Sequence, residues 1–349
     1  MAPNLYDIES YAYDLPEERI AQNPVSPRNH SKLLVLDKET GKMTHSHFYE
    51  LNKFLKEGDV IILNDTRVIP ARLHGIKEKG SAHVEILLLK PLDKNWKRWE
   101  ALLRPGRRLK PGSTVFVNDT TVVSIQDILR DGIRIVEFPA NCDVLSLLEH
   151  VGEVPFPPYI KETNATASDY QTVFAKRNGS CAAPTASLHF TEEQLRELSK
   201  DYGISFAWVT LHVGLGTFRP VQVEDIRKHI IHEEYCEIPK ETADFIRKAK
   251  REGRRILASG TTVARTLESM ATHDESVIHE GKKNTSLFIY PGYNFSVIDG
   301  LITNFHLPRS TLLMLVAALA GYDNVMEAYK TAVKMNYRFF SFGDAMLIQ

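Results

Sequence analysis

The stretch RILASGTTVARTLESMA, residues 255–271, contains the repeating unit that decides the fold. Arg255–Ser259 is a short apolar run typical of a buried strand, and Thr261–Ala271 is typical of a helix. Strands and helices alternate in the same way from Gln171 onward. Because such βα units pack into a sheet with helices on its faces, the sequence predicts an α/β domain with a largely parallel sheet, open or closed as a barrel.

The other elements of this half support the same prediction. Thr191 is placed to cap a helix whose apolar face includes Leu195 and Leu198. The expected helices are Thr191–Tyr202, Lys240–Glu252 and Ser310–Leu319, and the expected strands are Ile204–Val213, Leu287–Tyr290 and Leu301–Thr303.

Three polar loops follow predicted strands. They are Gly214–Arg219, Gly260–Thr262 with Arg265 one turn into the helix, and Asn304–Ser310. In βα folds, ligands bind at the carboxyl ends of the strands, where such loops lie. We therefore expect all three loops at one edge of the sheet and the active site between them.

The preceding part of the chain has a different pattern. Short β-type runs alternate with glycine- and proline-containing turns at Gly58–Leu63, Ala82–Leu89, Trp99–Leu103, Ser113–Val117 and Ile133–Phe138. Runs at this spacing indicate a small β-barrel or sandwich. The proline-rich segment Val154–Tyr159 is typical of a connection between domains.

The composition is that of a globular protein, with 349 residues, 43% of them hydrophobic and 25% charged. The formal net charge of -1 means that a nucleic acid would need a local basic patch. The three cysteines are isolated, which argues against a disulfide framework and indicates a reducing compartment. The N-terminus lacks signal-peptide features, and Leu312–Ala320 is about half as long as the ~20 residues of a membrane helix. A cytoplasmic protein outside the membrane is expected.

Two segments combine a histidine with small residues. In Pro184–Phe190, PTASLHF, a ligand could approach backbone N–H groups while His189 acts as acid or base, or the segment is a turn with a structural histidine. In Leu211–Gly216, LHVGLG, two glycines follow His212. They would let a flat ligand pack on the backbone, and a bulge or turn is the alternative.

Two other segments also allow two interpretations. The amides and hydroxyls of Gly260–Thr262 would suit a carboxylate or phosphate, although helix capping explains the threonines equally well. The aromatic segment Tyr337–Met346 fits a C-terminal core strand, with Arg338 or Asp344 alternatively pointing into the site.

One cluster of possible metal ligands does not form a known pattern. The cluster consists of His229, His232, Glu233 and Glu234. It has neither the HExxH spacing nor a facial triad. We therefore expect no metal, and favour a structural role or carboxylates that hold ribose hydroxyls.

Residues 90–110 carry a local excess of positive charge, with eight basic residues against Asp93 and Glu100. The basic residues are Lys90, Lys94, Lys97, Arg98, Arg104, Arg107, Arg108 and Lys110. Such a cluster can bind phosphates, and the interleaved Trp96 and Trp99 can stack on bases. A solvated hairpin face with Trp99 pointing inward is the alternative. Because the rest of the chain is near neutral, we favour nucleic-acid binding.

Eight motifs follow one another over nearly the full length of the chain. They are Tyr13–Glu17 with Ile20–Pro24, Asn64–Leu73, Ala182–Phe190, Val209–Phe218, Ala258–Ser269, Tyr290–Tyr293, Thr303–Leu315 and Tyr337–Met346. In this order they resemble the S-adenosylmethionine:tRNA ribosyltransferase-isomerase family of queuosine biosynthesis. Two departures stand out. Ser187 occupies the glycine position of the family's PTAGLHF, and Glu162–Asp169 lacks the family's acidic–arginine pairing.

The resemblance implies an α/β main domain of repeated βα units, an incomplete or distorted barrel, with an inserted small β-barrel domain. With the boundaries above, we expect the catalytic domain at residues 1–57 and 156–349, and the inserted, tRNA-contacting barrel at residues 58–155.

The resemblance also implies a reaction. The aminomethyl group of a 7-deazaguanine at the tRNA wobble position receives the ribosyl carbons of S-adenosylmethionine, giving epoxyqueuosine-tRNA with release of adenine and methionine. S-adenosylmethionine is then a co-substrate, tRNA carrying the precursor base is the partner, and no true cofactor or metal is involved. A monomer is expected.

This chemistry needs a base for a C5′ proton beside the sulfonium and an acid for the leaving adenine. The candidates for these roles are His189, His212, His306 and Asp299. Arg265 and Arg309 would bind the methionine carboxylate or a tRNA phosphate, and Tyr290 or Phe218 would stack on adenine. The other expected substrate-binding residues are Thr185, Gly214, Gly216, Thr261 and Thr262. The expected tRNA-binding residues are Arg67, Arg72, Lys97, Arg98, Arg104, Arg107, Arg108 and Lys110.

Two rival hypotheses belong to other classes. A methyltransferase using the same co-substrate would release S-adenosylhomocysteine instead of adenine and methionine. A non-catalytic RNA-binding module would bind tRNA with steep salt dependence but would show no turnover.

Overall fold

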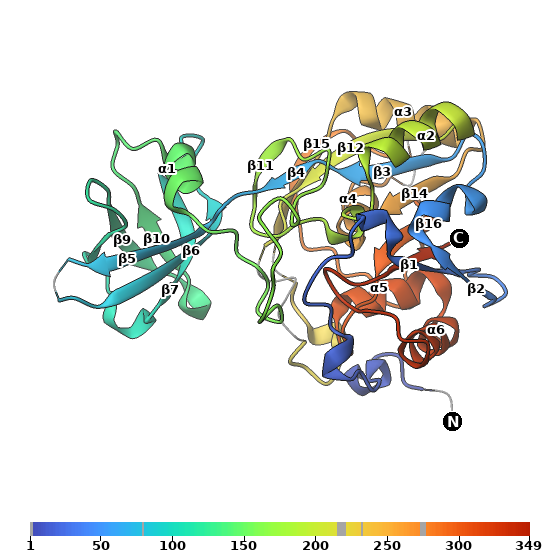
Figure 1. Ribbon diagram of the computed structural model, residues 1–349, viewed down its shortest axis with the longest axis horizontal. Coiled ribbons are helices and arrows are strands. Elements are labelled where there is room, and N and C mark those ends of the chain that lie inside the picture. Colours follow the sequence, from blue (N-terminus) through green and yellow to red (C-terminus); the bar gives the residue numbers. More distant parts are fainter. Residues whose placement is uncertain (1–2, 79, 215–220, 232, 273–276) are drawn as a thin grey trace. The chain divides into compact units, whose positions relative to one another are not determined.

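A nine-stranded mixed sheet organises the larger part of the structure, a computed structural model that describes residues 3–78, 80–214, 221–231, 233–272 and 277–349 (Figure 1). The strand order is β15 (Gly281–Thr285), β13 (Glu234–Ile238), β12 (Ser205–Leu211), β3 (Val60–Asn64), β14 (Ile256–Ser259), β16 (Gly300–Asn304), β17 (Ala345–Ile348), β1 (Lys32–Leu36) and β2 (Met43–His47). The four central strands β12, β3, β14 and β16 run parallel, so their carboxyl ends share one edge.

The sheet is buried on both faces. Along β3, Val60 and Ile62 belong to one hydrophobic core, and Ile61 and Leu63 belong to another. This follows from the two-residue alternation of a strand. The first core is closed by α3 (Lys240–Arg251), α4 (Thr261–Ser269), α5 (Thr311–Ala320) and α6 (Tyr322–Lys334), and the second includes α2 (Glu192–Tyr202).

Capping fixes where these helices begin and end. The side chain of Thr191 accepts a hydrogen bond from the N–H of Gln194 at the start of α2, and Ser310 caps α5 in the same way. Helix α2 ends at Gly203, whose φ of 67° is the left-handed conformation that glycine adopts without steric cost.

A closed, antiparallel β-barrel forms the second part of the structure. Its strands are β10 (Arg134–Glu137), β7 (Arg98–Arg104), β6 (His83–Pro91), β5 (Arg72–Lys77), β8 (Thr114–Phe116) and β9 (Val122–Ile128) in spatial order. In β7, Trp99, Ala101 and Leu103 are buried while Arg98 and Arg104 are exposed. The same unit contains α1 (Val144–Val151), β11 (Arg177–Ser180) and β4 (Thr66–Val68) except for its first residue, Thr66.

The α/β class and the small β-barrel predicted from the sequence are confirmed. The domain boundaries need correction. The barrel unit comprises 67–157 with 177–182, and the other unit comprises 1–66, 158–176 and 183–349. Residues 58–66 were assigned to the barrel, but β3 lies between β12 and β14 in the large sheet, where all its residues are buried.

Two expectations about the sheet also change. Its flanks are antiparallel, because β17 runs against β16, and β13 and β15 are antiparallel neighbours. Leu287–Tyr290 is not a strand. It is an extended connection that contributes Ile289 to the core, and the edge strand is the polar segment β15 just before it. A polar edge strand has no apolar pattern that a sequence could display.

Within the described residues, no single helix is long and apolar enough to cross a membrane. Helices α5 and α6 pass that test only as a pair bent by 118°, and both contribute buried side chains to the sheet's core.

Candidate active site

The carboxyl ends of three parallel strands line one cavity in the α/β unit. Val213 lies beyond β12, Gly260–Thr262 beyond β14, and Thr303–His306 at the end of β16. The Gly260–Thr262 and Asn304–Ser310 loops therefore meet, as the βα topology predicts, whereas most of the predicted Gly214–Arg219 loop lies outside the described residues. The other walls come from the turn at Thr185–Ser187 and from Phe340 with Ser341. The cavity volume is about 60 Å³, which is room for about two water molecules.

The backbone around this cavity is specified by Gly260 and Ser187. Gly260 has a φ of 103°, a conformation that only glycine adopts readily, and it turns the chain from β14 directly into α4. Ser187 does not have a positive φ, so the serine fits where the family pattern has glycine. Its hydroxyl lies 2.8 Å from that of Ser259, which ties the PTASLHF turn to the end of β14.

His306 lines this small cavity and is almost fully buried. Its Nε2 lies 2.9 Å from the hydroxyl of Thr303, and its backbone N–H donates to Tyr329. Burial lowers the pKa of His306 to about 3. The imidazole is therefore neutral at physiological pH, and its ring is held by its own strand end.

His189 faces a second, larger cavity of about 360 Å³ in the same unit. Four segments line it. They contribute residues 24–28 and Ser31, Asp169, Leu188 with His189 and Thr191, and Arg338 with residues 341–343. The expectation that PTASLHF forms one wall of the strand-end site is thus half correct. Pro184 to Ala186 line the small cavity, whereas His189 lines the large one.

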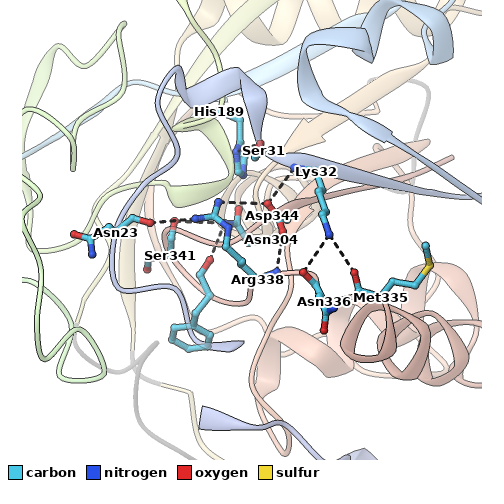
Figure 2. Close-up of polar contacts among 11 residues, drawn as sticks. Asn23, Ser31, Lys32, His189, Asn304, Met335, Asn336, Arg338, Ser341 and Asp344 are labelled. Atoms are coloured by element: carbon cyan, nitrogen blue, oxygen red, sulfur yellow. Dashed lines mark hydrogen bonds and ion pairs between the residues drawn. The ribbon is translucent and has the colours of Figure 1, made fainter. Parts of the chain in front are cut away.

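The His189 imidazole is held on one side only. Its Nδ1 lies 2.8 Å from the hydroxyl of Ser31 (Figure 2). Its buried Nε2 has no hydrogen-bond partner among the residues that the structure describes. Burial lowers the pKa of His189 to about 4, and the nearby carboxylate of Asp344 and amide of Asn304 oppose that shift. The Asn304 side chain influences the ring without completing a hydrogen bond to Nε2.

Arg338 lines the same cavity and forms an ion pair with Asp344 (Figure 2). Asp344 is 2% exposed and accepts hydrogen bonds from the N–H groups of Lys32 and Arg338, at 3.0 and 2.7 Å. The guanidinium lies 3.3 Å from the carboxylate and donates to the carbonyl of Asn23. Arg338 thus points into the site, which was one of the two interpretations of the C-terminal segment, and Asp344 supports it from behind.

The structure does not bring His212 or Asp299 to either cavity. His212 stacks on Tyr235, and its Nδ1 lies 2.8 Å from the Thr66 hydroxyl. Asp299 precedes β16, at the amino end of the strands, where it pairs with Lys250 at 3.0 Å and accepts from the N–H of Ile256. A carboxylate at that edge is separated from the cavity by the length of β16, so its role is structural.

Arg265 is occupied by an internal ion pair and does not reach the cavities. It is buried, pairs with Glu234 and donates to the carbonyl of Leu287 at 3.0 Å. Glu234 also accepts from the N–H of Gly214. A carboxylate that binds two protein donors is a poor ligand for ribose hydroxyls, the role considered for it from the sequence.

The remaining substrate candidates divide into two groups. Thr185, Thr261 and Thr262 line the small cavity. Tyr290 instead contacts Tyr6 and Phe288, and Arg309 is exposed and pairs with Glu9 at 2.7 Å. Gly216 and Phe218 lie outside the described residues. Among the described residues, no group of three or more His, Cys, Asp or Glu side chains is placed to hold a metal ion.

In the barrel unit, most of the predicted basic residues are exposed. Those exposed are Arg67, Arg98, Arg104, Arg107, Arg108 and Lys110, whereas Arg72 and Lys97 are half-buried. Trp99 is completely buried and donates to the carbonyl of Trp96, so it cannot stack on a base. The buried Arg134 was not singled out from the sequence. Its guanidinium donates to the carbonyls of Gly106 and Leu109 and so shapes the exposed basic turn.

Three residues of the large cavity were also missed, namely Arg28, Ser31 and Asp169. The only sequence signal near the first two is that they follow the family-like motif Ile20–Pro24. A cavity of ligand size with a buried, neutral imidazole is typical of an enzyme active site.

Comparisons with known proteins identify the family. The family described as queuosine biosynthesis protein matches residues 8–348. Proteins named S-adenosylmethionine:tRNA ribosyltransferase-isomerase from Carboxydothermus hydrogenoformans and Staphylococcus aureus are 52% and 51% identical, each over 98% of this chain and 99% of the relative. The crystal structure of an S-adenosylmethionine tRNA ribosyltransferase from Thermotoga maritima is 40% identical, with a TM-score of 0.56 over 97% of this chain and 100% of that one. The chain belongs to the queuosine biosynthesis protein family.

Proposed function

We propose that this chain is an S-adenosylmethionine:tRNA ribosyltransferase-isomerase. It transfers the ribosyl carbons of S-adenosylmethionine to 7-aminomethyl-7-deazaguanine at the tRNA wobble position and forms epoxyqueuosine-tRNA, adenine and methionine. The observation that carries this proposal is the full-length similarity to proteins of that name. The enzyme acts as a cytoplasmic monomer and uses no metal or redox cofactor.

His189 is the residue we assign to proton transfer. The reaction removes a proton from C5′ beside the sulfonium and returns a proton to the leaving adenine. His189 is neutral, and its Nε2 makes no hydrogen bond to any described residue. With the ring proton on Nδ1, beside the Ser31 hydroxyl, Nε2 can accept the first proton. The His189 pKa of about 4 makes the protonated ring a strong acid, which favours delivery of that proton to adenine, and makes the neutral ring a weak base for C5′. The tRNA amine then attacks, and closure of the epoxide expels methionine.

The β-barrel unit supplies the tRNA contacts in this proposal. The exposed side chains of Arg104, Arg107, Arg108 and Lys110 lie on or next to the turn that Arg134 shapes from within. A rigid cluster of cations suits a phosphate backbone, because the side chains need little reorganisation to bind it. Trp96, which is half-buried, is the only one of the two indoles in this cluster with any surface available to a base.

Incubation with S-adenosylmethionine and precursor-modified tRNA tests the function directly. Free adenine and methionine are the expected products. Release of S-adenosylhomocysteine would instead support a methyltransferase, and tRNA binding without any turnover would support an RNA-binding module. Single-turnover rates of His189→Ala, His212→Ala and His306→Ala test the assignment of roles. The largest loss is expected for His189→Ala, and wild-type rates in all three would refute it.

A further inference from the structure

The large cavity beside His189 has the size of a ligand site, and the strand-end cavity does not. Small-molecule sites span about 300–1,000 Å³. The large cavity measures about 360 Å³, and the strand-end cavity about 60 Å³. Both lie in the α/β unit, and Ser341 lines both of them. Of these two cavities, the one beside His189 therefore has room for the larger part of a small-molecule ligand.

The walls of the large cavity combine flat, apolar surfaces with planar cations. Val25, Leu188 and Phe342 supply apolar surface. Arg28 donates to the carbonyl of Gln171 at 2.9 Å, and Arg338 donates to that of Asn23 at 3.2 Å. A guanidinium that is anchored through its N–H groups can stack on a flat ring through its face.

The charges of the cavity balance. Arg338 is paired with the buried carboxylate of Asp344, and the carboxylate of Asp169 acts on Arg28. A phosphate or a carboxylate ligand would need an excess of positive charge. The balanced set instead suits a neutral, polar ring.

The unpartnered Nε2 of His189 shows where such a ring would be recognised. The side chain is 5% exposed and is fixed through Nδ1 by Ser31. Buried polar atoms almost always have partners, so a free Nε2 on a cavity wall indicates a ligand atom.

We propose that this cavity is a nucleobase-binding pocket in which His189 contacts the edge of the ring and Arg28 and Arg338 contact its faces. Pockets that enclose a single base use this combination of apolar faces and edge hydrogen bonds. The inference rests on the proposed function, which provides two sources of a base: the adenine of S-adenosylmethionine and the modified base of the tRNA.

Binding without turnover tests the pocket independently of the reaction. The probes are 5′-methylthioadenosine, which carries the adenine, and free 7-aminomethyl-7-deazaguanine, which represents the tRNA base. The wild-type protein is labelled with ¹⁵N-histidine, and the His189 signals are assigned by their loss in His189→Gln. We expect one probe to shift the Nε2 signal of His189, and the probe that does so identifies the source of the base.

A steric block provides the second measurement. Val25→Trp should weaken binding of that probe at least tenfold and raise KM for the matching substrate. Tyr202→Trp, at an exposed site on α2 that lines neither cavity, is the control and should leave both unchanged. If Val25→Trp does not fold, the histidine spectra of the wild-type protein decide alone.

The two proposals fail in different ways. If wild-type protein releases adenine but neither probe shifts His189 Nε2, the pocket assignment is overturned. The same holds if Val25→Trp folds and binds the probe with wild-type affinity. If no adenine is released although a probe shifts His189, the pocket stands and the proposed reaction fails.

Discussion

Acid should destabilise the α/β unit through His306, and the size of the effect follows from the burial of its imidazole. The pKa of His306 is lowered to about 3 by burial, whereas an unfolded histidine titrates near ~6.5. Above pH ~6.5 the ring is neutral in both states, and its contribution to stability is fully present. Below that pH the unfolded chain binds a proton that the folded protein excludes, so the free energy of unfolding falls by about 1.4 kcal/mol per pH unit.

The comparison with His306→Gln isolates the contribution of His306 to the pH dependence of the free energy of unfolding. Glutamine keeps a hydrogen-bonding group near the Thr303 hydroxyl but does not titrate. Between pH 7.5 and pH 5 the free energy of unfolding should fall by about 2 kcal/mol more in the wild-type protein than in the variant. The reason is that about 1.5 pH units of this range lie below the unfolded-state pKa of ~6.5. All other titrating groups, including His189, are common to both proteins and cancel.

Urea denaturation followed by circular dichroism at 222 nm measures the effect, because α2–α6 all lie in the α/β unit. His150→Gln replaces an exposed histidine of the barrel unit and should show the wild-type pH dependence. Linkage requires the difference in free energy of unfolding between wild type and His306→Gln to change with pH. If that difference stays constant within about 0.5 kcal/mol from pH 7.5 to pH 5, the reasoning is refuted.

Three further predictions concern other residues. Trp99→Ala should destabilise the barrel by about 3–5 kcal/mol in urea titrations, because Trp99 is fully buried; an unchanged midpoint would contradict its place in the core. Replacing the exposed Arg107 and Arg108 by Glu should weaken tRNA binding and reduce the slope of log K against log salt by about two. A slope equal to wild type would remove both from the interface. Glu268→Gln should cost about 2 kcal/mol of stability, because the buried carboxylate accepts the N–H groups of residues 296–298; a stability equal to wild type would show those bonds to be weak.

The local pattern of the sequence determined much of the fold. Alternating strands and helices, with capping residues such as Thr191 and Ser310, predicted α2–α5 and three of the four parallel central strands, β12, β14 and β16. The fourth, β3, was assigned to the barrel. Parallel strands share the direction of their carboxyl ends, so the meeting of the Gly260–Thr262 and Thr303–His306 segments followed without coordinates. The ordered motifs likewise identified the family, because they are spread over nearly the whole chain.

Tertiary structure alone decided which side chains form the site. Ser31 and His189 are 158 positions apart, and Asn23 and Arg338 are 315 apart. Periodicity reports burial and local conformation over a few turns, and it carries no information on pairs at such separations. The same limit explains why Asp299 and Arg265 were assigned to the site although each is occupied by an ion pair. The sequence predicted which residue types could act in the site and which loops lie at the strand ends. The cavity that His189 faces exists only because three segments distant in the sequence fold against the His189 segment.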